Sequence, residues 1–85
     1  MSKTTTEADP ELIGSLQKRR DELAAQVPQL EQDVQVLEQE LGAATTFDAA
    51  AAVEKRLAVT QAKLRTVRGE LIVATRDLVA AEQAA

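Results

Sequence analysis

Carboxylates are the side chains of this sequence that come nearest to a chemical site. Four acidic residues lie close together, namely Glu31, Asp33, Glu38 and Glu40, and carboxylate oxygens are the ligands that a divalent cation prefers. On a helix with the seven-residue repeat described below, Glu31 and Glu38 point to one side and the other two carboxylates to the opposite side. The ligands diverge, so we expect no metal site.

Other reactive groups are scarce. The sequence contains no Cys and no His, and its serines are Ser2 and Ser15. Disulfides, thiolate and imidazole metal ligands, and nucleophile and base pairs that use Cys or His are therefore excluded. We expect no catalytic residue, no cofactor and no enzymatic activity.

The basic residues do not form a convincing binding site either. The short run Lys18-Arg19-Arg20 is followed directly by Asp21 and Glu22, and the formal net charge of the chain is −4. A nucleic-acid site usually needs a basic excess and aromatic side chains that stack on bases. No segment approaches the roughly 18 apolar residues of a membrane span, and residues 1–9 lack the apolar core of a signal peptide. We expect a soluble protein of the cytoplasm or of a virion, without contacts to nucleic acid or membrane.

The elements that position these residues are indicated by leucines that recur at every seventh position in both halves of the chain. They are Leu16, Leu23, Leu30 and Leu37, and then Leu57, Leu64, Leu71 and Leu78. A repeat of this kind predicts two helices that pack along their apolar seams. The predicted fold class is all-α: a two-helix antiparallel coiled-coil hairpin that assembles into a four-helix bundle or a larger helical oligomer.

The expected organisation is a flexible tail over residues 1–9 and a hairpin over 10–84, with helices over about 10–41 and 48–83 and a loop over 42–47. Asp9 followed by Pro10 is a strong N-terminal signal for the first helix. Gly42 supplies a natural C-terminal stop. For the second helix, either Thr45 together with Asp48 or Asp48 alone can cap the N-terminus.

Pro28 conflicts locally with this pattern, because a proline inside a helix removes one backbone hydrogen bond and clashes with the carbonyl of Ala24. The seven-residue repeat nevertheless continues through it. We expect a kinked continuous helix, with a break and restart over 26–28 as the alternative.

The two seams are compatible when the helices run in opposite directions. With Leu41 opposite Val53, leucine pairs alternate with smaller pairs, and Arg20 faces the small Ala74. In this register three flanking pairs carry opposite charges: Glu40 with Arg56, Asp33 with Lys63, and Arg19 with Asp77. One flanking pair, Glu38 with Glu54, is unfavourable. The charges therefore select this register, but they contribute little to the stability of the hairpin.

The second helix carries apolar residues outside its seam, and these predict a protein interface. The candidate interface residues are Val59, Gly69, Ile72, Val73 and Val79 on the second helix and Phe47 at the loop. Phe47 has two interpretations: a contact for a partner, or a hydrophobic staple that packs on the first turn near Ala52.

These features favour a non-enzymatic structural or adaptor protein, a small subunit of a larger assembly such as a phage virion or scaffold. The expected partner is protein, either a second copy bound through the second helix or a larger assembly. The alternatives are a small acidic inhibitor or antitoxin-type protein that binds one larger partner, and a chaperone-like hairpin that grips clients with its ends.

Overall fold

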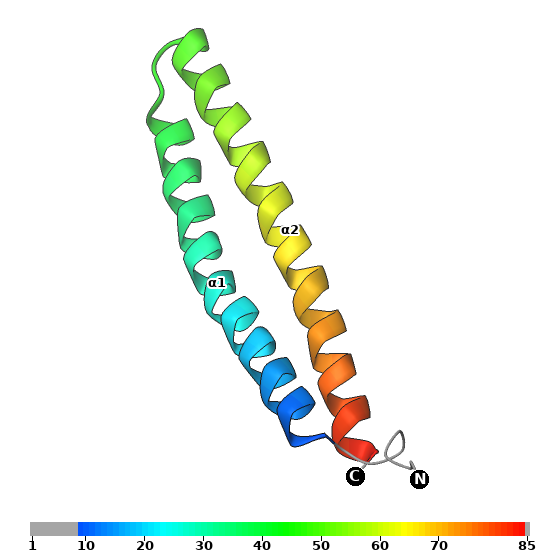
Figure 1. Cartoon of the computed structure of the whole chain (residues 1–85). Coiled ribbons are helices and arrows are strands. Elements are labelled where there is room, and N and C mark those ends of the chain that lie inside the picture. Colours follow the sequence, from blue (N-terminus) through cyan, green and yellow to red (C-terminus); the bar gives the residue numbers. More distant parts are fainter. Residues whose placement is uncertain (1–8, 85) are drawn as a thin grey trace, which may run out of the picture.

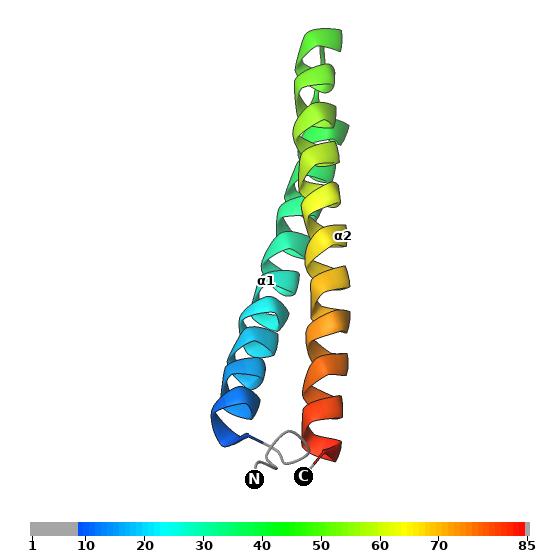
Figure 2. The same ribbon diagram turned by 45° about the vertical axis from the view of Figure 1, so that its right-hand side comes forward.

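The computed structural model describes residues 9–84 and contains two long helices, α1 (Pro10–Ala43) and α2 (Phe47–Gln83). The helices lie side by side and are joined by a short loop, and the described part contains no strand (Figures 1 and 2). The described part of the chain is thus an all-helical hairpin. The predicted tail over residues 1–9 lies outside the described residues except for Asp9.

The packing face of each helix is the leucine seam. Every residue expected at a seam position between Ile13 and Ala81 is buried or half-buried. The other side chains in the described range are exposed, apart from those of Asp33 and Ala44. The fully buried core consists of Leu23, Leu30, Leu37, Leu64, Val67, Ala74 and Leu78. Leu78 is only 2% exposed, whereas the half-buried seam residues stay in contact with water along the rim of this narrow core.

The N-terminus of α1 follows the prediction. The Asp9 carboxylate accepts a hydrogen bond from the Glu11 backbone N–H at 2.9 Å, and Pro10 occupies the first helical position. Pro10 has no N–H to leave unsatisfied there, and its fixed φ suits the helix. The helix also continues through Pro28, so the alternative of a break and restart is wrong.

The predicted end of α1 at Gly42 is wrong. The helix includes Gly42 and ends at Ala43, and no described glycine has a positive φ. The chain leaves through Ala44, whose extended backbone donates its N–H to the Leu41 carbonyl at 3.2 Å. Because this exit needs no left-handed residue, the conformational freedom of Gly42 is not used.

The predicted caps of α2 are wrong: the observed cap is Thr46, one position after Thr45 and two before Asp48. Thr46 adopts an extended conformation, and its Oγ1 accepts a hydrogen bond from the Ala49 backbone N–H at 3.1 Å. Phe47 is therefore the first helical residue, and Asp48 lies inside the first turn, where its charge complements the helix dipole. Two adjacent threonines can each cap a helix, and the sequence did not distinguish them.

Ion pairs link the two helices only partly as expected. Arg56 contacts Glu40 at 3.6 Å, which is one of the three predicted pairs. Arg19 contacts Glu70 at 3.4 Å rather than Asp77, and Arg68 contacts Glu31. Asp33 and Lys63 form no ion pair in the described structure. Each exposed ion pair contributes only about 0 to 1 kcal/mol to stability, so a long exposed side chain can pair with any of several nearly equivalent partners.

Arg20 occupies its seam position as expected for a snorkelling side chain. It is half-buried, and its guanidinium donates to the Asp21 carboxylate at 2.9 Å and 3.1 Å. The aliphatic stem covers the seam while the charge stays at the surface.

Candidate functional site

The strongest candidate site is an apolar face of α2 that points away from α1. Four large aliphatic side chains on it are exposed: Val59 by 65%, Ile72 by 60%, Val73 by 52% and Val79 by 44%. On the same face lie the exposed small residues Ala58, Ala62, Thr66, Gly69 and Ala80. We call these nine residues the outer strip. Several exposed aliphatic side chains on one face of a helix are typical of an interface with another protein.

Gly69 and Thr66 leave the middle of the outer strip without a large side chain. A Cβ built on Gly69 would meet nothing within 4 Å, so the packing of the hairpin itself does not require a glycine there. The Thr66 hydroxyl donates to the Ala62 carbonyl at 3.1 Å. Because that hydroxyl already has a partner within the helix, a surface that covers Thr66 need not provide one.

Basic residues lie among the outer-strip residues, whereas the edge of the strip nearer to α1 carries both basic and acidic residues. Lys55, Arg65 and Arg76 are exposed on the same side of α2 as the strip. Along the edge nearer to α1 the charges change sign, with Arg56 and Lys63 followed by Glu70 and Asp77. Two residues of this edge already contact α1 through the pairs Glu40–Arg56 and Arg19–Glu70.

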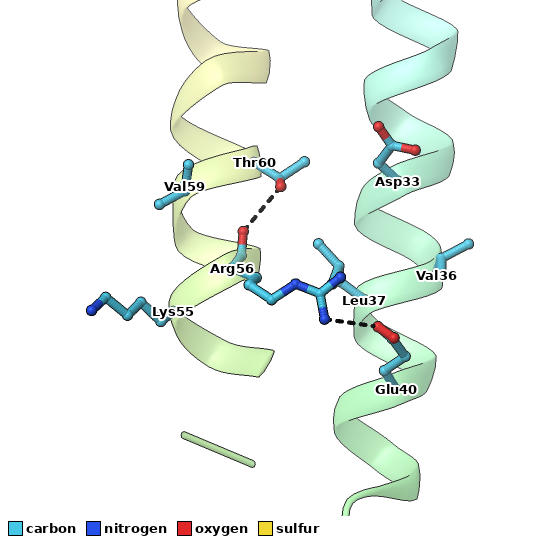
Figure 3. Close-up of a pocket in the computed structure, with 8 residues that line it drawn as sticks. All are labelled: Asp33, Val36, Leu37, Glu40, Lys55, Arg56, Val59 and Thr60. Atoms are coloured by element: carbon cyan, nitrogen blue, oxygen red, sulfur yellow. Dashed lines mark hydrogen bonds and ion pairs between the residues drawn. The ribbon is translucent and has the colours of Figure 1, made fainter. Parts of the chain in front are cut away.

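The groove between the helices near the loop is lined by side chains of both helices (Figure 3). Arg56 reaches across it to Glu40, Leu37 lies at its floor, and Val36 and Val59 point away from each other on the outer sides of their helices. The Thr60 hydroxyl is bonded to the Arg56 carbonyl at 3.0 Å. The ion pair and this hydrogen bond hold the side chains of Arg56, Glu40 and Thr60 in contacts within the hairpin.

Phe47 is the most exposed large apolar residue of the described chain, at 86%. The staple interpretation predicted that it would pack on the first turn of α2, and this is wrong. The reason is that Thr46 is the cap, so Phe47 is the first helical residue and not the residue before the cap that a staple requires. The structure therefore places a bare aromatic ring at the tip of the hairpin.

Some of the remaining charged candidates have partners within the hairpin. Within the run Lys18-Arg19-Arg20, both arginines form ion pairs, with Glu70 and Asp21. Of the acidic segment, Glu31 and Glu40 contact α2 through its arginines. Over residues 9–84 no three His, Cys, Asp or Glu side chains are grouped closely enough to hold a metal ion, and no helix has the length and apolar character to cross a membrane.

The predicted interface residues therefore fall into two places. Val59, Gly69, Ile72, Val73 and Val79 share the outer strip, and Phe47 lies apart from them at the tip. Two exposed aliphatic residues of α1 were missed, Leu12 at 50% and Val36 at 48%. Their signal was present in the sequence, since both are large aliphatic residues outside the seam positions.

Comparison with known proteins gives no relative to reason from: no family model, no curated protein and no solved structure shows a significant match to this chain. Its function must be inferred from its own surfaces.

Proposed function

We propose that this chain is a non-enzymatic structural or adaptor subunit, an antiparallel coiled-coil hairpin that self-associates through α2. The observation that carries the proposal is the outer strip, where Val59, Ile72 and Val73 are each at least half exposed on one face of one helix. Covering such a face removes apolar surface from water, which stabilises the complex by about 25 cal/mol for each Å² buried. A component of a virion or of a scaffold is the most concrete form of this role.

The size of the core supports the need for a partner. The hairpin buries only residues of the seam between its two helices. A chain of 85 residues without disulfides has few other sources of stability. Two-helix units of this kind are marginal, and a second copy would add burial that one copy lacks. Folding and association are then linked, so stability rises with protein concentration.

Sedimentation velocity over a wide concentration range, with circular dichroism on the same samples, tests this role. We expect a helical dimer or higher oligomer that dissociates on dilution. The Val73→Asp variant should sediment as a monomer, because it places a charge within the buried face. Val36→Asp is the matched control, since Val36 is similarly exposed but lies on α1. A helical wild-type monomer at high micromolar concentration would refute the proposal.

The exposure of Phe47 favours a second activity, the docking of the hairpin tip on another protein. Aromatic side chains are enriched among the residues that dominate binding energy. If the tip grips unfolded clients in the manner of a chaperone, the protein should suppress aggregation of a heat-unfolded client, and Phe47→Ala should lose that effect without losing helicity. Equal suppression by the variant would exclude a role for the ring.

A further inference from the structure

We propose that the second copy binds in antiparallel orientation along the outer strip of α2, with a two-fold axis halfway between Thr66 and Gly69. This inference rests on the proposed self-association and specifies its geometry.

The outer strip contains a second seam with the spacing of a coiled coil. Residues that follow one another at alternating intervals of three and four are Val59, Ala62, Thr66, Gly69 and Val73, and all of them are exposed in the hairpin. This seam lies on the side of α2 away from α1. Lys55 and Arg76 continue the spacing at its two ends.

Antiparallel pairing of this seam with itself produces compatible layers. Around the axis, Thr66 of each copy faces Gly69 of the other, and the next layer brings Ala62 to Val73. The outermost layers bring Arg76 to Val59 and Lys55 to Ala80, so neither basic residue meets another basic residue. Their stems can cover these smaller side chains while the charged ends reach water, as Arg20 does within the hairpin.

The centre of this contact is suited to close approach of two backbones. Gly69 has open space where a Cβ would lie, and the Thr66 hydroxyl is already bonded to the Ala62 carbonyl at 3.1 Å. A glycine in the middle of a helix is unfavourable relative to alanine by about 1 kcal/mol. A neighbouring helix packed against this position gives that glycine a physical role that the hairpin alone does not.

Charge selects the register. In the proposed pairing Arg56 of one copy meets Asp77 of the other, and Lys63 meets Glu70, each contact occurring twice by symmetry. A shift of seven residues in one direction sets Lys63 against its own symmetry mate, and a shift in the other direction does so for Glu70. Arg56 and Glu70 also contact α1, which would extend each contact into a chain of alternating charges.

An alternative seam turned toward Ile72 and Val79 is less favourable. Antiparallel pairing of that seam brings Glu54 close to Glu82 at both ends, with repulsion in place of attraction. The proposed seam instead leaves Ile72 and Val79 at its edge, where they add apolar surface. Since the outer strip faces away from α1, the dimer is a layer of four helices with the two α2 helices in the middle.

The test uses the full chain, sedimentation equilibrium at low ionic strength and circular dichroism. Single reversals Lys63→Glu and Glu70→Lys should each weaken dimerisation about tenfold, and the double variant should restore it to within about threefold. The two residues are seven positions apart on one helix, beyond the reach of neighbours on a helical surface. Rescue therefore reports a contact between copies.

A second variant guards against loss of folding. Gly69→Leu raises helix propensity but blocks close approach, so it should weaken dimerisation by about a hundredfold while helicity at high concentration is kept. Gly14→Leu is the matched control, because Gly14 is also open but lies on α1. It should leave dimerisation unchanged.

Three results would overturn the inference. If Gly69→Leu blocks association but the double reversal does not rescue, the strip is the interface and the two-fold register is wrong. If the wild type associates and Gly69→Leu has no effect, the contact lies elsewhere, although self-association stands. A helical wild-type monomer at every concentration overturns the proposed function as well, and means that a different protein covers the strip.

Discussion

Pro28 lies inside the continuous helix α1, with its ring exposed on the side away from the seam. It has no N–H to donate to the Ala24 carbonyl, and its ring crowds that carbonyl. Replacing it by alanine should restore the hydrogen bond without altering a seam contact. The interior penalty of proline relative to alanine is about 3 kcal/mol, so the Pro28→Ala variant should gain about 2 to 3 kcal/mol. That is a large share of the roughly 4 to 13 kcal/mol expected for a domain of this size.

Urea denaturation followed by circular dichroism measures this gain directly. The midpoint should rise with an unchanged slope, and the melting temperature should rise by about 10 to 20 °C. Wild type and variant must be compared at one protein concentration, because association would add to the stability of both. Gln32→Ala, an exposed change one turn further along α1, should shift stability by less than about 0.5 kcal/mol.

A Pro28→Ala variant of unchanged or lower stability would refute this reasoning. It would mean that the geometry of α1 around the proline is itself required for the fit of the two seams. A change in the slope of the denaturation curve would instead indicate that the variant alters the compactness of one state, and the gain could not be read from the midpoint alone.

Further predictions concern the ends, the seam and the tip. Thr46→Ala removes the cap of α2 and should lower the free energy of unfolding by about 1 kcal/mol in urea denaturation, with an equal effect of Asp48→Ala as the contrary result. Leu78→Ala should cost about 2 to 4 kcal/mol in the same assay, because Leu78 is 2% exposed; a loss below 1 kcal/mol would show that the seam collapses around the cavity. Phe47→Ala should leave the melting temperature unchanged within about 2 °C, since the ring is 86% exposed. A large drop would mean that the ring packs on the first turn of α2 after all. Glu40→Gln should change stability by less than about 1 kcal/mol, and the effect should vanish at high salt.

The packing faces of this hairpin were predictable because they depend on a pattern repeated over many residues. A single misplaced residue does not obscure a repeat that runs from Ile13 to Leu41 and again from Ala50 to Ala81. One-residue slips of such a seam would expose leucines and bury charges, which is strongly unfavourable. The burial of each expected seam position follows from that penalty.

The ends of the helices and the ion pairs were harder to predict because the competing choices differ little in energy. A cap at Thr46 and one at Thr45 or Asp48 differ by about 1 kcal/mol at most, which the wider fold can override. Gly42 was assigned a left-handed exit that the chain did not need. Arg19 contacts Glu70 and not Asp77 for a similar reason, since both carboxylates line the same groove as this long exposed side chain.

The exposed aliphatic residues were predictable as a group but not as an interface. Val59, Ile72 and Val73 fall outside the seam, so their exposure follows from the same repeat that buries the leucines. The repeat does not determine whether another chain covers them; in the proposed dimer, the charges beside the strip determine the orientation and register of the second copy. Those charges form favourable pairs only in a particular orientation and register of the two copies.

The bare ring of Phe47 at the hairpin tip gives the proposed dimer a second property, bivalency. With helices that overlap in opposite directions, the two rings lie at opposite ends of a rod, about 60 Å apart at a rise of 1.5 Å per residue. A rigid spacer raises avidity strongly when the two target sites match its span and contributes nothing when they do not. The pair of tips would thus discriminate among assemblies by the distance between their repeating sites rather than by the chemistry of any one site.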